Sequence, residues 1–127
     1  MLPVFLLPET TVREAGNGSD LDLGESQGRT VLLTLGITRI IEQESLDVSI
    51  LGSADGNEWG TKALIRFPQK FYCGTYQILL DLTQHPGVKF VRVKWNAQRW
   101  GKGDTKPLFG FYVFAQEMRQ QVLAASA

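Results

Sequence analysis

Hydrophobic and polar residues alternate with a period of two over several segments of this chain, as they do in half-buried β-strands. In segment 88–96, Val91, Val93 and Trp95 alternate with basic and amide side chains. Segment 45–52 alternates in the same way. Each segment is therefore predicted to bury one face and to expose the other.

Similar patterns recur between Gly, Pro, Asn and Asp residues, and helical periodicity is almost absent before the last dozen residues. The pattern predicts eight strands, at residues 3–7, 10–15, 29–40, 45–52, 62–67, 75–83, 88–96 and 107–116. Eight strands in 127 residues suit an all-β, two-sheet antiparallel β-sandwich of the jelly-roll or discoidin-like kind. We expect a single domain over residues 1–127, with residues 116–127 as a short helix or a flexible tail.

Two segments are apolar on both faces instead of one. They are residues 30–41, interrupted only by Gly36, and residues 108–114. This pattern is typical of central strands, or of strands that a loop or a partner covers. Neither segment specifies its own register strongly, because both of its faces are alike.

Turn-forming residues separate the strands. Residues 16–20 are predicted to form a loop, and residues 54–57 carry the Asp-Gly signal of a tight hairpin turn. Residues 85–87 and 101–104 mark two further turns.

The composition is that of an ordinary globular domain, with 43% hydrophobic and 20% charged residues. The single cysteine, Cys73, cannot form an intramolecular disulfide, so a reducing compartment is the default expectation. The apolar run 2–7 lacks a preceding basic segment and is interpreted as a strand, not as a signal peptide. No stretch has the length of a membrane-spanning helix.

Charge is distributed unevenly although the net charge is zero. Residues 1–60 hold ten acidic and three basic side chains, and residues 61–127 hold ten basic and three acidic ones. Early and late strands that lie side by side would neutralise each other by cross-strand pairing. Alternatively, the two signs occupy separate surfaces through which copies attract head to tail.

Catalytic equipment is sparse, so we expect a protein that is not an enzyme. His85, the only imidazole, precedes Pro86 in an evident turn, where a solvated histidine is the simpler interpretation. Cys73 lies beside aromatic residues and is interpreted as a small apolar filler. One Cys and one His cannot assemble a zinc site, and no cofactor is expected.

Calcium is a weak alternative for the loop that follows the first strands. Its oxygen-bearing side chains include Asp20 and Asp22, which are the weak calcium candidates. Their spacing does not match an EF-hand, so a plain acidic loop is the preferred interpretation.

Basic residues and tryptophans interleave between residues 89 and 106. This combination suits contact with a polyanion, a single-stranded nucleic acid or a sugar, but it also suits a solvated sheet face opposite the acidic strands. Trp95 follows the alternation and is assigned to the core, whereas Trp100 lies outside it and is the better exposed contact. The candidate ligand-binding residues are Trp100, Arg92, Lys94, Arg99, Lys102, Tyr72 and Tyr76.

The segment from Ser53 to Trp59 reads Ser-Ala-Asp-Gly-Asn-Glu-Trp. It resembles the Ser-x-Asp-Gly-x-x-Trp strand-turn of discoidin-type β-sandwich modules. In that pattern the Asp-Gly pair turns the chain and the tryptophan plugs the sandwich. The resemblance therefore implies an interior position for Trp59.

The chain from residue 5 to residue 114 also resembles small β-sandwich structural proteins of tailed phages and prophages. The shared features are a Gly/Asn/Ser/Asp loop in 11–23, a Gly-led apolar strand in 28–40, the Asp-Gly turn, an arginine-bearing strand in 88–95 and a Pro-x-Phe-x-Phe-x-Val strand in 107–113. The resemblance implies a virion head or tail component without catalytic activity. The loop 98–106 is longer and more basic than that pattern, and the tail after residue 116 has no counterpart in it.

We therefore expect a non-catalytic structural or interaction domain that assembles with itself or with another protein, through sheet edges or complementary charge. A carbohydrate-binding module that uses loop aromatics is the first alternative, and a polyanion-binding domain is the second. Neither a nucleic acid nor a membrane is an expected partner. The expected location is the cytoplasm, or the virion if the chain derives from a phage.

Overall fold

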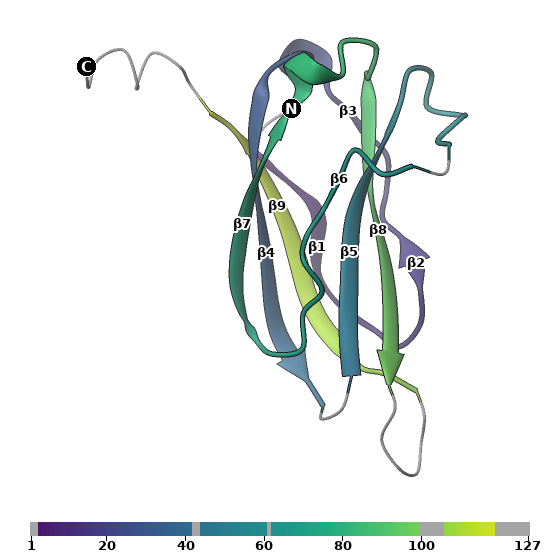
Figure 1. The fold of residues 1–127 in the computed structure, drawn as a ribbon, viewed down its shortest axis with the longest axis vertical. Helices are drawn as coiled ribbons and strands as arrows, with labels where there is room; N and C mark the ends of the chain where they lie inside the picture. The colour runs from purple at the N-terminus through teal and green to yellow at the C-terminus, as the bar shows by residue number, and fades with distance from the viewer. Residues whose placement is uncertain (1–2, 42–43, 61, 100–105, 119–127) are drawn as a thin grey trace, which may run out of the picture.

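The computed structural model describes residues 3–41, 44–60, 62–99 and 106–118. Two antiparallel sheets face each other across a hydrophobic core, which confirms the predicted all-β sandwich (Figure 1). The strands are β1 (Val4–Val12), β2 (Gly16–Asn17), β3 (Leu21–Asp22), β4 (Thr30–Ile40), β5 (Glu44–Ser53), β6 (Ile65–Arg66), β7 (Gly74–Asp81), β8 (Phe90–Arg99) and β9 (Phe109–Glu117). Two 3₁₀ turns, η1 (Gly24–Ser26) and η2 (Leu82–Gln84), lie between strands.

The strands of the two sheets alternate along the chain. The first, here called sheet A, has the strand order β1-β9-β4-β7. The second, sheet B, has the order β2-β8-β5-β6, and β3 also pairs with β8. In sheet A the first described strand, β1, therefore pairs with the last, β9, and β9 lies between β1 and β4.

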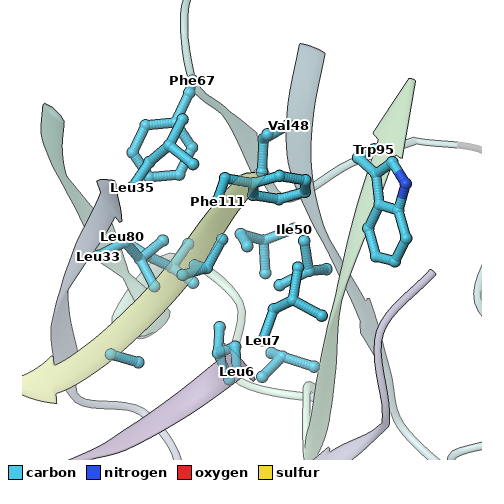
Figure 2. Close-up of a cluster of buried hydrophobic side chains, with 14 of the residues drawn as sticks. Leu6, Leu7, Leu33, Leu35, Val48, Ile50, Phe67, Leu80, Trp95 and Phe111 are labelled. Atoms are coloured by element: carbon cyan, nitrogen blue, oxygen red, sulfur yellow. The ribbon is translucent and has the colours of Figure 1, made fainter. Parts of the chain in front are cut away.

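The predicted period-two burial is confirmed in both alternating segments. Val91, Val93 and Trp95 of β8 are 3%, 0% and 8% exposed, so they face the interior of the sandwich. The equivalent residues of β5 are buried as well. Figure 2 shows how Val48 and Ile50 from sheet B meet Phe111 from sheet A between the two layers.

The two segments that are apolar on both faces form β4 and β9, the central strands of sheet A. Their predicted central position is therefore confirmed. Residues 3–7 and 10–15, predicted as separate strands, correspond instead to one strand, β1. Register shifts between Phe5 and Leu7 and between Leu7 and Thr10 let β1 continue along β9 past Pro8.

Other boundaries differ from the sequence-based expectation. The predicted strand 62–67 shortens to the two residues of β6, and the predicted loop 16–20 contains β2, which pairs with β8. Residues 116 and 117 extend β9 and do not start a helix. Met118 follows the strand and donates its backbone N–H to Thr30 O, and residues 119–127 of the predicted tail lie outside the described residues.

The Asp-Gly turn after β5 forms, but it does not make the predicted tight hairpin. The carboxylate of Asp55 accepts hydrogen bonds from the backbone N–H groups of Glu58 and Asn57 and from the Ser53 hydroxyl. These hydrogen bonds, in that order of importance, hold the pKa of Asp55 below its ordinary value of 3.8. The strand that next pairs with β5, β6, begins only at Ile65, so the two strands are not joined by a tight turn.

Candidate interaction surface

The outer face of sheet A carries large apolar side chains that nothing in the described chain covers. Because Phe111, Val113 and Ala115 of β9 point into the core, the alternate residues of that strand project outward. Phe5 of β1 and Leu79 of β7, the two edge strands of sheet A, are 50% and 53% exposed. We call this surface the aromatic face; its members are Phe5, Leu32, Leu79, Tyr112 and Phe114.

The aromatic rings form one cluster on this face. Phe5 and Phe114 pair across β1 and β9, and their ring centroids lie 4.9 Å apart in an edge-to-face arrangement. The Phe5 and Tyr112 centroids lie 5.7 Å apart with the same kind of geometry. A shallow hollow of about 450 Å³ lies among these three rings, Pro8, Glu9 and Thr34. Edge-to-face contact is one of the arrangements that aromatic pairs prefer.

The polar groups around the aromatic face are mostly uncharged and already bonded. Gln77 Nε2 donates to Thr34 Oγ1 at 3.2 Å. Glu9, the one charged residue that lines the hollow, accepts a hydrogen bond of 2.6 Å from the Thr38 hydroxyl. The hollow is thus lined by apolar rings and carries one charged residue, Glu9, and the buried core of a protein interface is likewise poor in charged residues.

Arg92, a predicted ligand contact, serves the internal structure of sheet B. Its guanidinium lies 4.3 Å from the centroid of the Trp59 ring and 3.6 Å from Asp20 Oδ1. Its Nε is buried without a hydrogen-bond partner.

Trp59 contacts Arg92, so it packs on the outer face of sheet B and holds the segment that follows β5 against that face. The expectation that Trp59 fills the interior is wrong, because β5 already supplies Leu46, Val48 and Ile50 to that space.

The remaining candidate ligand contacts separate into different places. Lys94 is exposed on the outer face of sheet B, and Arg99 is half-buried at the end of β8. Tyr72 is 76% exposed in the loop before β7. Tyr76 supports that same loop, because its hydroxyl donates to Tyr72 O at 3.2 Å. Trp100 and Lys102 lie outside the described residues.

The weak calcium candidates have separate structural partners. Asp20 contacts Arg92, and Asp22 Oδ1 accepts a 2.9 Å hydrogen bond from the Gly24 backbone N–H. Within the described ranges, no group of three or more His, Cys, Asp or Glu side chains is placed to hold a metal ion. The Asp20–Arg92 pair joins an acidic residue of the first half to a basic residue of the second, but Asp20 lies between β2 and β3, so this contact is not a cross-strand pair.

Cys73 is not the apolar filler that its aromatic neighbours suggested. Its side chain is exposed in the same loop as Tyr72. Nor do the described residues include a helix long and apolar enough to cross a membrane.

Comparison with solved structures finds this fold in a virus. A chain in the structure of the infectious bursal disease virus Gx strain matches with a TM-score of 0.51 and 7% sequence identity. The match covers 88% of this chain but only 30% of the viral chain. No protein-family model matches the sequence, and comparison with curated proteins gives no match either. At this identity the likeness concerns the fold alone.

Proposed function

We propose that this chain is a non-catalytic structural domain that acts through protein–protein assembly, in the manner of a phage-type virion component. The observation that carries the proposal is the aromatic face, on which Phe5 and Leu79 are each about half exposed. Contiguous apolar surfaces of this kind mark interaction sites in monomer-sized domains. The fold match to a chain of a virus structure supports the same class of role.

The proposed partner at this face is a second copy of the same chain. The face has a single charged residue at its hollow, Glu9, so two copies related by a two-fold axis meet without a large like-charge penalty. Two β-sheets stack face to face about 10 Å apart, with strands nearly aligned, when their facing side chains are apolar. Phe5 on β1 and Leu79 on β7 provide such side chains on the two edge strands of sheet A.

The whole outer surface of sheet A, which includes the aromatic face, is large enough for a modest dimer interface. Four strands spaced about 4.8 Å apart, with about nine residues at 3.3 Å each, present a surface of roughly 20 by 30 Å. Two such faces together bury about 1,200 Å², the lower end of the range for specific interfaces. We therefore expect a reversible dimer whose population depends on protein concentration.

Light scattering coupled to size-exclusion chromatography over a range of concentrations tests this proposal. The unmodified chain is expected to shift from monomer to dimer as its concentration rises. Leu79→Lys places two like charges in the proposed interface and is expected to leave only monomer. Because Leu79 is 53% exposed, the variant keeps the fold, which circular dichroism checks.

Tyr72→Lys is the matched control, since it alters a residue that is 76% exposed but lies outside the aromatic face. This variant is expected to dimerise like the unmodified chain. A chain that stays monomeric at every concentration overturns the proposal. A dimer that persists in Leu79→Lys would show that the aromatic face is not the interface.

A further inference from the structure

The outer face of sheet B contains a polar cleft, on the opposite side of the sandwich from the aromatic face. Its volume is about 330 Å³, within the range of small-molecule sites in proteins. The side chains that project into it come from three adjacent strands, β6, β5 and β8. Ala63 and Leu51 form its apolar wall, where the loop after β5 folds back over the sheet.

One row across the cleft carries two positive charges. Arg66 pairs with Ser49 across β6 and β5, and Ser49 pairs with Lys94 across β5 and β8, so the three residues share one face. Neighbouring strands lie about 4.8 Å apart, which places the two basic residues roughly 10 Å from each other. Neither Arg66 nor Lys94 forms an ion pair with a described residue. An anionic group held between them would neutralise both charges, and the guanidinium can bind it through two parallel hydrogen bonds.

The next row carries groups that bind hydroxyls instead of anions. Asp47 and Asn96 pair directly across β5 and β8, one side-chain step from Ser49 and Lys94. Gln69 Nε2 donates to Asp47 Oδ2 at 3.1 Å, which fixes the carboxylate and leaves Oδ1 without a partner among the described residues. The amide of Asn96 both donates and accepts. A hydroxyl group can therefore bridge Asp47 and Asn96.

We propose that this cleft binds an acidic sugar, with its carboxylate between Arg66 and Lys94 and a ring hydroxyl between Asp47 and Asn96. Residues two apart on a strand are separated by roughly 6.6 Å, a distance comparable to the span of one pyranose ring. A simple anion such as phosphate uses only the basic row. A neutral sugar uses only the Asp47–Asn96 row and lacks the charge-assisted contacts.

Titration of the full chain, labelled with nitrogen-15, tests the assignment by the amide shifts of Ser49, Lys94 and Asn96. D-Glucuronate is expected to give saturable shifts at these positions. Glucose and inorganic phosphate are expected to bind at least about tenfold more weakly, the effect of losing one good polar contact. Arg66→Ala and Lys94→Ala are each expected to weaken glucuronate binding by about the same factor.

Two further variants separate this proposal from simple charge attraction. Asn96→Ala is expected to weaken glucuronate binding and to leave phosphate binding unchanged. Lys89→Ala removes an exposed cation that does not line the cleft, and it is expected to change neither. The proposal is overturned if glucuronate gives no saturable shift, if phosphate binds as tightly as glucuronate, or if Lys89→Ala matches Lys94→Ala. The dimer proposed above concerns the other sheet, so either proposal can fail alone.

Discussion

The Tyr112 side chain lies across the backbone of Gly36, its partner on the neighbouring strand of sheet A. A Cβ atom at Gly36 would stand 2.1 Å from Tyr112 Cε2 and 2.2 Å from Cζ, far inside contact distance. Gly36 is therefore needed here for space, because the ring occupies the volume of a side chain. The same ring makes the edge-to-face contact with Phe5 on the aromatic face.

Substitution Gly36→Val is expected to push the Tyr112 ring off β4. Overpacking of this kind costs about 1–2 kcal/mol in the free energy of unfolding, because the ring can still rotate toward solvent. Urea denaturation measures the loss. The same substitution in a Tyr112→Ala background is expected to cost clearly less, since the ring is gone. Equal costs in the two backgrounds would show that the two residues do not compete for space.

Glu44 is expected to be important for stability because its carboxylate accepts hydrogen bonds from two backbone groups of the chain. It is 1% exposed, and its two carboxylate oxygens accept hydrogen bonds from the backbone N–H groups of Ile41 and Leu108, at 3.0 and 2.8 Å. Glu44→Ala leaves both partly buried donors without this acceptor and should cost about 1–3 kcal/mol in the free energy of unfolding. Glu44→Gln should cost less, because its amide oxygen still satisfies one donor.

Glu58→Ala is the control for Glu44, since Glu58 is an exposed acid whose side chain has no such role. Its free energy of unfolding is expected to change by less than about 0.5 kcal/mol. Comparable losses for the two alanine variants would contradict the role given to the Glu44 carboxylate.

Acid is expected to loosen the turn after β5. The folded pKa of Asp55 lies below its ordinary value of 3.8, so the ionised carboxylate stabilises the fold. That contribution is fully present above the unfolded pKa and is lost as the pH falls through the folded pKa. Melting temperature should therefore decrease as the pH drops below about 4.

Asp81, whose pKa is lowered chiefly by the Thr83 hydroxyl and then by the Thr83 backbone N–H, contributes in the same direction. Asp55→Ala should melt lower at neutral pH and lose part of the decrease in acid. An Asp55 carboxyl that titrates by nuclear magnetic resonance at or above 3.8 would contradict the assignment.

Trp59→Ala should release the loop that follows β5. The contact between Trp59 and Arg92 contributes about 1–2 kcal/mol, given that the guanidinium is partly desolvated. Limited proteolysis should then cut between residues 54 and 64 faster than in the unmodified chain. Unchanged cleavage would show that hydrogen bonds around Asp55 hold this loop by themselves.

The strands with one buried face were predictable because their apolar and polar residues alternate along the sequence. The alternation around Val93 fixed both the strand and its orientation, and the doubly apolar segments indicated the centre of a sheet. The short strands β2 and β6 show no such alternation, since a strand of two residues is too short to display a period of two. Their pairing depends on neighbours that are distant in sequence, Lys94 for Asn17 and Ser49 for Arg66.

The candidate interaction surfaces were harder to predict from the sequence than the fold was. The motif around Trp59 was visible, but whether that ring enters the sandwich depends on which face of sheet B the following loop covers. The aromatic face brings Phe5 beside Phe114, residues from opposite ends of the chain. The sequence shows that both are aromatic, and only the strand order β1-β9-β4 shows that they meet.

That strand order also affects how the chain acquires its fold during synthesis. β1 and β4 leave the ribosome early, yet the strand that separates them is β9, which begins only at Phe109. Until β9 emerges, two unpaired strand edges remain open to other chains, and pairings this distant in sequence form slowly. Assistance by a chaperone, or rapid capture by a neighbouring copy, would therefore matter most in the interval before the final strand is complete.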